Sequence, residues 1–251
     1  MDLYDAFGLV HGAIVAAVGG GGKTSLIFAL ANNAAERGLS AIVTTTTKFT
    51  PPPGIPLPPV LETSDSRAEE DIKLALAPGN VVVAITGRGE RERMLGFEPQ
   101  TIVSMEATSP GLIVIEADGS AHRPFKAPGE HEPVIPACAT DVIVCVGLDV
   151  LGHRLDETWV HRPEIVAALS GARTGEIVTA DMIVQVLTAG GGGRKHVPHG
   201  ARIHALLNHP RTPEHESLGK HIAQRLVYEG FATAVVATAH TPGGDVRAVV
   251  R

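Results

Sequence analysis

The residues with the clearest chemical potential form a glycine-rich stretch near the start of the chain, Val18-Gly19-Gly20-Gly21-Gly22-Lys23-Thr24-Ser25. Glycines let the backbone turn tightly and direct several N–H groups at one small anion. The lysine could reach the terminal phosphates of a nucleotide, and the Thr24 hydroxyl could complete the coordination of Mg²⁺. The pattern therefore predicts a phosphate-binding loop in which residues 19–25 bind nucleotide.

The flanking residues can position this loop. Residues 13–18 are an apolar run of strand length, and residues 24–37 carry apolar side chains at helical spacing until Gly38 ends the pattern. A strand, a glycine loop and a helix thus follow one another in the order that a P-loop requires, and the helix dipole would add positive potential at the anion. A flexible glycine turn is the alternative interpretation.

The spacing departs from the usual G-x-x-x-x-G-K-[ST] pattern, because Ala17 stands at the position of its first glycine. The shorter form G-x-x-G-K-T fits from Gly19 to Thr24. It resembles the loops of Mur-type ligases and of some deviant P-loop proteins. Amide-bond ligation through an acyl phosphate is therefore one conceivable function, although no other feature of the sequence points to it.

Two acidic residues, Glu116 and Asp118, follow a second apolar run at 111–115. This arrangement has the form of a Walker B strand, whose terminal acid holds magnesium directly or through water. Residues two apart in an extended chain point to the same side. We therefore predict that Glu116 binds the metal together with Thr24, that Asp118 orients the nucleophile, and that Lys23 completes the catalytic set. A strand-end turn of solvent-facing acids is the alternative.

Two further polar segments follow predicted strand ends and could hold an anionic substrate. Residues 120–133 form an irregular loop that is dense in histidine, arginine and lysine, and residues 44–48 contain four threonines and a lysine. The predicted substrate-binding residues in these segments are Thr46, Thr47, Lys48, His122, Arg123 and Lys126. A proline-rich surface connection and a strand end rich in β-branched residues are the alternatives.

Three arginines, Arg88, Arg91 and Arg93, lie past the third predicted strand and could supply charge to a transition state. Glu90 and Glu92 alternate with them. This alternation favours a solvated loop whose charges neutralise one another.

Apolar runs that lack period-2 alternation and are separated by helical segments predict a mostly parallel sheet with helices on both faces, an α/β fold like that of the P-loop NTPases. Active sites of such sheets lie at the carboxyl ends of the strands. We expect a single domain over residues 1–251, with a possible small helical insertion at 161–198. The predicted strands span 13–18, 40–44, 81–86, 111–116, 141–147, 201–207 and 232–237. The predicted helices span 4–10, 24–37, 69–77, 99–105, 161–169, 180–187 and 214–229.

Several local features refine this prediction. Ser64 or Ser66 could cap the helix at 69–77, and Thr179 could cap the helix at 180–187. The proline-rich stretch 51–59 predicts a surface excursion that is partly polyproline II in character, and the glycine run at 190–193 predicts a flexible loop.

Composition limits the classes of partner. The chain has 251 residues, 44% of them hydrophobic, and a net charge of −6 with acidic and basic residues interspersed, so nucleic acid is not an expected partner. No apolar run reaches membrane-spanning length and the first residues lack a signal-peptide pattern, so we expect a cytoplasmic protein with no membrane partner. Cys138 and Cys145 are expected to be reduced thiols, and the 12 histidines show no metalloprotease spacing.

With these residues in view, the sequence resembles the YqeC family, P-loop proteins associated with the maturation of selenium-dependent molybdenum hydroxylases. The glycine loop carries the resemblance together with Thr44-Thr45-Thr46-Thr47-Lys48, the segment 116–136 and Val160-His161-Arg162-Pro163-Glu164. The resemblance adds Arg162 to the predicted substrate-binding residues. It implies a nucleotide-binding accessory role in preparing or inserting a molybdopterin-type cofactor, with a small anionic cofactor precursor and possibly a molybdenum hydroxylase as partners.

One departure from the family bears on the nucleotide. Members resemble Asn-Lys-Val-Asp after the strand that corresponds to 205–207, a pattern like the guanine-binding motif of GTPases. This chain has Asn208-His209-Pro210-Arg211 there, without that lysine or aspartate. ATP with Mg²⁺ is therefore the expected cofactor pair, and GTP is less favoured.

Two functions remain open. The first is an enzyme, either an NTPase or a small-molecule kinase, that carries out Mg²⁺-dependent phosphoryl transfer or nucleotide hydrolysis. The second is a switch with little catalysis of its own, in which nucleotide orders the segment 44–48 and the proline-rich stretch while the protein delivers cofactor to a hydroxylase.

Overall fold

A computed structural model describes residues 1–51, 57–240 and 243–251, and within these residues nine strands form one sheet. The strand order is β14-β13-β12-β10-β1-β8-β2-β5-β4, and every neighbouring pair is parallel except β13 and β14. The strands are β1 (Ala13–Gly19), β2 (Ala41–Thr45), β4 (Val60–Glu62), β5 (Val81–Ile85), β8 (Leu112–Glu116), β10 (Asp141–Gly147), β12 (Arg202–Asn208), β13 (Thr233–Thr238) and β14 (Asp245–Val250). Because β1 lies between β10 and β8, the loop that follows it sits near the middle of the sheet.

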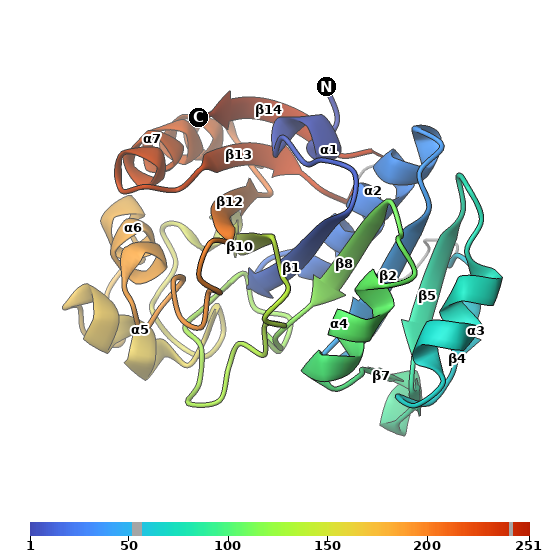
Figure 1. Ribbon diagram of the computed structural model, residues 1–251. Coiled ribbons are helices and arrows are strands. Elements are labelled where there is room, and N and C mark those ends of the chain that lie inside the picture. Colours follow the sequence, from blue (N-terminus) through green and yellow to red (C-terminus); the bar gives the residue numbers. More distant parts are fainter. Residues whose placement is uncertain (52–56, 241–242) are drawn as a thin grey trace.

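Helices cover both faces of the sheet (Figure 1). One face carries α1 (Leu3–Ala6) and α2 (Lys23–Glu36), and the other carries α3 (Ala68–Ala75), α4 (Pro99–Glu106), α5 (Pro163–Ser170), α6 (Ala180–Thr188) and α7 (Pro213–Tyr228). Each strand therefore needs apolar side chains on both sides. In β1, Val15 and Ala17 face the α2 layer, whereas Ala16 and Val18 face the other layer.

Burial of the α2 face fixes the helix on the sheet. Leu26, Ile27 and Leu30 are each 0% exposed, and full burial of one such side chain contributes about 1.5–3 kcal/mol. Since α2 begins directly after the glycine loop, this packing holds the helix start at the carboxyl end of β1.

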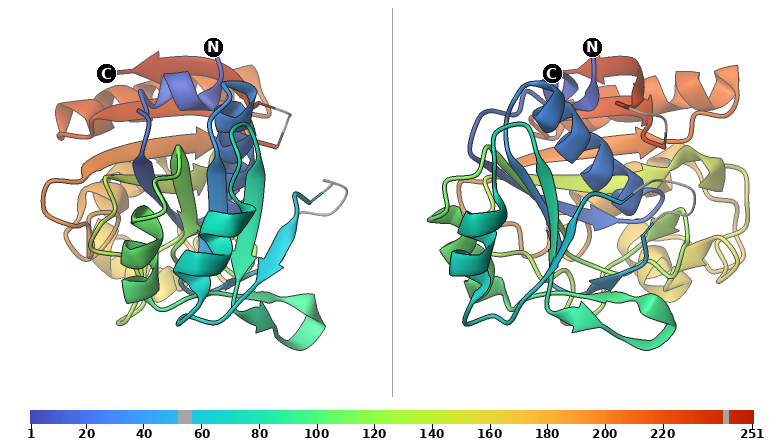
Figure 2. Two further views of the ribbon diagram at one scale, coloured as in Figure 1. Left: turned by 45° about the vertical axis from the view of Figure 1, so that its right-hand side comes forward. Right: turned by 90° about the vertical axis from the view of Figure 1, so that its right-hand side faces the viewer.

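Short strands extend the carboxyl edge of the sheet. A three-stranded sheet consists of β3 (Lys48–Phe49), β7 (Met94–Leu95) and β6 (Gly87–Arg88), and a pair joins β9 (Phe125–Lys126) to β11 (Val160–His161). Figure 2 shows the β6–β7 hairpin projecting from the lower end of the molecule, with a 3₁₀ turn (Glu90–Glu92) at its tip. A second 3₁₀ turn (Leu148–Val150) follows β10. The hairpin and these turns are additions around the carboxyl ends of the main strands.

The predicted fold class is confirmed, with corrections in detail. The first helix is shorter than the predicted 4–10, and the edge strands β4 and β14 were not among the predicted strands. The predicted cap at Ser64 or Ser66 is wrong, because the helix begins after Arg67 without a side-chain cap. The predicted cap at Thr179 is confirmed, since its hydroxyl accepts from the Met182 N–H.

The glycine run, the two cysteines and the proline-rich stretch are further predicted features. The glycine run 190–193 lies in a turn after α6, where a Cβ would lie 1.9 Å from the Val186 carbonyl oxygen at Gly192 and 2.5 Å from the Leu187 carbonyl oxygen at Gly193, so these two glycines serve close packing. Both cysteines are free thiols, and Cys145 is buried, as predicted. The central part of the proline-rich excursion, 52–56, lies outside the described residues.

The helical insertion predicted at 161–198 contains α5 and α6, whose apolar residues join the same core as the sheet. No helix in the described ranges is both long and apolar enough to cross a membrane.

Candidate functional site

The glycine loop packs tightly against other backbone segments. An added Cβ would lie 2.4 Å from the Cys145 carbonyl oxygen at Gly19 and 2.2 Å from the Gly147 nitrogen at Gly21. Gly21 and Gly22 also have φ values of +69° and +112°, and this left-handed conformation costs other residues about 1–2 kcal/mol. The glycines are therefore required by the fold itself, before any ligand is considered.

The N–H groups of the loop divide into two sets. Those of residues 19–21 donate to protein acceptors at 2.9, 2.9 and 3.1 Å. Those of residues 22–25 stand at the start of α2, where no intrahelical acceptor exists, and no other acceptor for them is found in the described part of the chain. Free N–H groups at a helix start attract anions, so this second set is the part of the loop that could bind phosphate.

Lys23 is held inside the loop. Its Nζ donates to the Gly19 carbonyl oxygen at 2.6 Å and forms an ion pair with Asp118 Oδ1 at 3.2 Å, with both side chains almost fully buried. Burial lowers the pKa of Lys23, but the Asp118 and Glu116 carboxylates outweigh it and raise the pKa above its usual value. The lysine is therefore a buried cation on the first residue of α2, where the free N–H groups stand.

Thr24 and Glu116 meet on the other side of the loop. The Thr24 hydroxyl donates to Glu116 Oε2 at 2.7 Å, although the two residues are 92 positions apart in the sequence. Burial raises the pKa of Glu116 above its usual value, while Lys23 and the Thr24 hydrogen bond oppose that shift. A hydroxyl and a carboxylate beside a phosphate-binding loop are the two protein ligands expected of a nucleotide-bound Mg²⁺.

The Thr24 hydroxyl and the Glu116 carboxylate would hold a metal ion only together with further ligands. In the described residues no three His, Cys, Asp or Glu side chains come together as a metal site of their own. Mg²⁺ keeps several waters and takes oxygen ligands from phosphates, so a hydroxyl and one carboxylate are enough when a nucleotide is bound. The donor set fits Mg²⁺ as a partner of the nucleotide and not as an independent metal centre.

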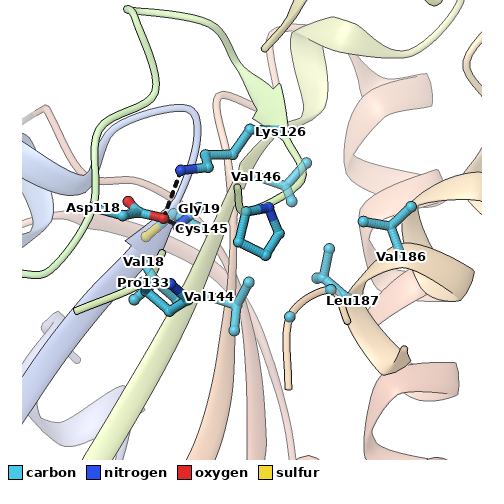
Figure 3. Close-up of a pocket in the computed structure, with 13 residues that line it drawn as sticks. Val18, Gly19, Asp118, Lys126, Pro133, Val144, Cys145, Val146, Val186 and Leu187 are labelled. Carbon is cyan, nitrogen blue, oxygen red and sulfur yellow. Dashed lines mark hydrogen bonds and ion pairs between the residues drawn. The ribbon is translucent and has the colours of Figure 1, made fainter. Parts of the chain in front are cut away.

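Asp118 belongs to a chain of alternating charges, and Figure 3 shows its ion pair with Lys126. Besides Lys23, it contacts Lys126 Nζ at 3.0 Å, and Lys126 in turn contacts Glu132 at 2.7 Å. Arg162 completes the chain by binding both Glu132 oxygens, at 2.7 and 3.2 Å. Burial raises the pKa of Glu132, but Arg162 and Lys126 outweigh it and lower the pKa to about 2.

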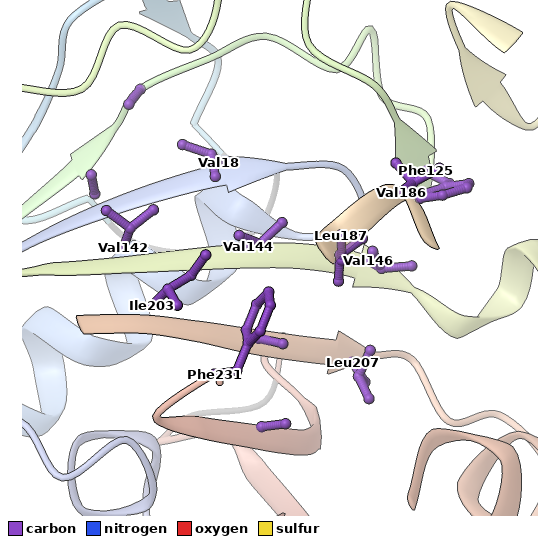
Figure 4. Close-up of a cluster of buried hydrophobic side chains, with 14 of the residues drawn as sticks. Val18, Phe125, Val142, Val144, Val146, Val186, Leu187, Ile203, Leu207 and Phe231 are labelled. Carbon is purple, nitrogen blue, oxygen red and sulfur yellow. The ribbon is translucent and has the colours of Figure 1, made fainter. Parts of the chain in front are cut away.

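A small cavity of about 20 Å³ adjoins this charge chain, which is room for about one water molecule. Asp118 and Lys126 form part of its wall, and the rest is mainly apolar (Figure 3). Val144, Val186 and Leu187 in that wall belong to the core between the sheet and α6 (Figure 4). The cavity is too small for a nucleotide, so the ligand-sized space must lie on the other side of the loop.

That space is a cleft of about 410 Å³ at the carboxyl edge of the sheet. Its middle is formed by the helix start and Glu116, and its ends by loops that follow other strands. The residues that line it are Gly21, Gly22, Lys23, Thr24, Ser25, Lys48, Phe49, Thr50, Pro51, Arg93, Glu116, Gly119, Ser120, Ala121, His122, Arg123, Pro124, Asp149, His209 and His240.

Asn208 joins the loop to the end of the sheet nearest β13. Its Nδ2 donates to the Gly21 carbonyl oxygen at 2.7 Å, and its Oδ1 accepts from the Ala239 N–H at 3.0 Å. His209 and Arg211 follow, with nitrogens 3.7 and 3.5 Å from Asp149 Oδ2. The asparagine thus braces the glycine loop, while the neighbouring positions offer an Asp–His–Arg cluster.

The cleft brings together part of the predicted site. The predicted residues that line it are Gly21, Gly22, Lys23, Thr24, Ser25, Lys48, Glu116, His122 and Arg123. The others, which are absent from its described lining, are Gly19, Gly20, Thr46, Thr47, Asp118, Lys126 and Arg162.

The residues outside the lining have other contacts. The Thr46 hydroxyl donates to the Val134 carbonyl oxygen at 2.6 Å, so it joins the end of β2 to the loop after β9. The Thr47 N–H donates to Thr45 Oγ1 at 3.0 Å, a local contact within the turn after β2. Lys126 and Arg162 face carboxylates. Their roles in substrate binding, and that of Asp118 with a nucleophile, stay predictions; the contacts of Asp118 are those of a residue that holds Lys23.

Eleven of the residues that line the cleft were not among the predicted site residues, and Arg93, Gly119, Asp149 and His240 are four of them. Asp149 and His240 follow β10 and β13 closely, so the rule that sites lie at carboxyl ends of strands could have indicated them. A Cβ on Gly119 would meet nothing within 4 Å. The protein packing gives no reason for a glycine there, in contrast to the phosphate loop.

Comparison with known proteins agrees with the resemblance seen in the motifs. The model of the YqeC protein family matches residues 15–164, which contain the glycine loop, Glu116 and the charged loop after it. An uncharacterized protein YqeC of Escherichia coli (strain K12) is 32% identical over 196 residues, which cover 78% of this chain and 75% of the relative. No solved structure matches the chain. The chain therefore belongs to the YqeC family.

Proposed function

We propose that this protein binds a nucleoside triphosphate with Mg²⁺ in the cleft and transfers or hydrolyses its terminal phosphoryl group. The observation that carries the proposal is the 2.7 Å hydrogen bond between Thr24 and Glu116 beside four unpaired N–H groups. A glycine loop alone could be a turn. A hydroxyl at the helix start that meets an acid from a neighbouring strand is the arrangement that nucleotide-bound magnesium requires.

Each residue then has a distinct task. The N–H groups of residues 22–25 would bind phosphate oxygens, and Lys23 would exchange its contact with the Gly19 carbonyl for a terminal phosphate oxygen. Thr24 and Glu116 would hold Mg²⁺, which neutralises charge on the phosphates. Asp118, with its contacts to Lys23 and the Gly19 N–H, would keep the lysine and the loop in place.

ATP remains the favoured nucleotide. A guanine-binding carboxylate of the GTPase kind would stand at position 211, where this chain has an arginine that is paired with Asp149. A cation at that position gives no acceptor for the N–H groups of guanine.

A calorimetric titration of ATP and GTP, each with Mg²⁺, into the wild type and Lys23→Ala tests the proposal. We expect the wild type to bind ATP more tightly than GTP and the variant to lose at least tenfold in affinity, about 1.4 kcal/mol. Lys220→Ala is the matched control, because Lys220 is a half-exposed helix residue paired with Glu216. Failure of the wild type to bind either nucleotide would reject the proposal.

A switch with little catalysis is the second candidate, and one observation favours it. The Lys23–Asp118 ion pair is one end of a chain of charges that runs through Lys126 and Glu132 to Arg162, and in this candidate Lys23 leaves Asp118 when it binds phosphate and so changes the balance of that chain. Nucleotide state could then be transmitted to α5, which begins next to Arg162. This candidate predicts slow hydrolysis and a partner affinity that differs between nucleotide states; equal affinity in the apo, diphosphate and triphosphate forms would eliminate it.

The family resemblance suggests where this chemistry is used. We infer a role in the maturation of a molybdopterin-type cofactor for a hydroxylase of the selenium-containing or the selenium-free kind, with a small anionic precursor as acceptor. Cells that lack the protein should then contain hydroxylase with reduced molybdenum cofactor content, measured on the purified hydroxylase. Complementation with wild type but not with Lys23→Ala would connect the nucleotide site to that role.

A further inference from the structure

Two cations in the cleft have no partner within the described residues. Lys48 and Arg93 both line the cleft and are exposed, and neither side chain has a carboxylate or another hydrogen-bond acceptor in the described part of the protein. Arg88, on the same hairpin, contacts Glu92 at 3.6 Å instead and does not line the cleft. The predicted self-neutralisation of the hairpin therefore holds for Arg88 but leaves Arg93 free.

Strand register places the two cations on one face of the small sheet. In the β3–β7 pair, Lys48 stands opposite Leu95, and Phe49 stands opposite Met94. Phe49 and Met94 are buried, 2% and 0% exposed, so they mark the inner face. Side chains alternate along a strand, so Lys48 and Arg93 share the outer face as diagonal neighbours, which lie about 7–8 Å apart.

Lys48 and Arg93 lie at one end of the cleft, and Asp149 and His209, where the base of the nucleotide would bind, lie at the other. β3 continues from β2, which lies two strands from β1 on the β8 side, about 10 Å away at usual strand spacing. Asp149 and His209 follow β10 and β12, on the opposite side of β1. The phosphate loop and Glu116 lie between the two ends. The cations therefore stand beyond the place where the terminal phosphate would bind.

Two other basic residues predicted to bind substrate, Lys126 and Arg162, are already neutralised by carboxylates. Lys126 contacts two carboxylates, and Arg162 binds Glu132. Arg123, which also lines the cleft, has no carboxylate partner in the described residues but donates to the Glu157 carbonyl oxygen at 2.6 Å. Lys48 and Arg93 are thus the lysine and the arginine of the cleft that lack any hydrogen-bond acceptor in the described residues, in a protein whose net charge is −6. An arginine fork next to a lysine point charge is the combination that suits phosphate oxygens.

We propose that Lys48 and Arg93 form an anion subsite that binds a phosphate group of a second substrate, the acceptor, next to the terminal phosphate of the nucleotide. This inference rests on the proposed function. It adds Arg93 to the substrate-binding residues and makes the acceptor a phosphate-bearing molecule.

Inorganic phosphate is a suitable probe for the subsite. The protein is first saturated with Mg²⁺ and a non-hydrolysable triphosphate analogue of ATP, and phosphate is then titrated in and followed by calorimetry or ³¹P NMR. We expect wild type and Arg88→Gln to bind phosphate alike, and Arg93→Gln and Lys48→Gln to bind it at least tenfold more weakly, about 1.4 kcal/mol. All variants should bind the analogue itself within threefold of wild type.

Each other result decides the matter. If Arg93→Gln weakens the analogue tenfold, Arg93 holds the nucleotide and the subsite is wrong. If the analogue binds normally but phosphate fails to bind, or binds equally to wild type and Arg93→Gln, the subsite is wrong while the proposed nucleotide function stands. If the wild type does not bind the analogue, the proposed function fails, and the subsite fails with it.

Discussion

Substitution of Gly21 by alanine should destabilise the protein through two separable effects. The first is conformational, because Gly21 has φ +69°, and a left-handed residue with a Cβ costs about 1–2 kcal/mol. The second is steric, because the new Cβ would lie 2.2 Å from the Gly147 nitrogen and 2.8 Å from the Pro124 carbonyl oxygen. Crowding of this kind costs about 1–3 kcal/mol.

Three other glycines isolate these effects. Gly152 has φ +79° but open space around its Cβ position, so Gly152→Ala tests conformation alone. Gly20 lacks a positive φ but would place its Cβ 2.7 Å from the Arg123 carbonyl oxygen, so Gly20→Ala tests contact alone. Gly119 has neither restriction. Replacing glycine by alanine also stabilises by about 0.4–1 kcal/mol through the unfolded chain.

The expected losses in unfolding free energy follow from these terms. They are about 2–4 kcal/mol for Gly21→Ala, about 1–2 for Gly20→Ala and about 0.5–1 for Gly152→Ala, whereas Gly119→Ala should gain about 0.4–1 kcal/mol. Urea unfolding followed by circular dichroism gives each value from the midpoint and slope. If Gly21→Ala proved no less stable than Gly152→Ala, the loop would not pack against Gly147 as described, and the argument that the fold requires these glycines would fail.

Three more outcomes follow from the site. Glu116→Ala should lower turnover at least 100-fold but keep nucleotide affinity within about tenfold, measured by steady-state kinetics and calorimetry; near-normal turnover would remove Glu116 from the metal site. Gly119→Ala should fold normally yet weaken nucleotide or acceptor binding severalfold, because its Cβ enters the cleft; unchanged titrations would show that no ligand approaches there. Glu132 has a pKa near 2, below the 4.5 of a free glutamate, so its contribution to stability is complete above pH 4.5 and is lost as pH falls through 2. The full pKa shift corresponds to about 3 kcal/mol of unfolding free energy, and partial exposure reduces this to about 1–2 kcal/mol. Glu132→Gln should therefore lower the unfolding free energy by about 1–2 kcal/mol at pH 7. Its unfolding free energy should also depend less on pH between 4.5 and 2 than that of the wild type, as measured by urea midpoints.

Local sequence predicted the main elements well where burial is two-sided. The residues 141–147 were predicted and found as a strand, because an unbroken apolar run can be accommodated only between two covered faces. The edge strand β14 (Asp245–Val250) escaped prediction because its residues are only half-buried and carry charges. The first helix is shorter than predicted because the chain turns at Gly8, whose φ is +61°.

The candidate site was predictable in part for a similar reason. Lys23, Thr24 and Glu116 are recognisable from residue type and spacing, because phosphate and magnesium need those groups at a strand end and a helix start. Arg93 was not distinguishable from Arg88 in sequence, since both alternate with glutamates. Only the register of β3 against β7 shows which arginine enters the cleft and which pairs with Glu92.

The sequence by itself determined the glycine loop, the acid that ends β8 and the family to which the chain belongs, because these depend on residues that are close together in the chain. Tertiary structure decided which charges remain free. Lys126 and Arg162 are not free to bind an anionic substrate, because strand pairing and a long loop bring Asp118 and Glu132 into contact with them. Partners separated by many residues are joined only by folding, and a buried charge is stable only when such a partner is present.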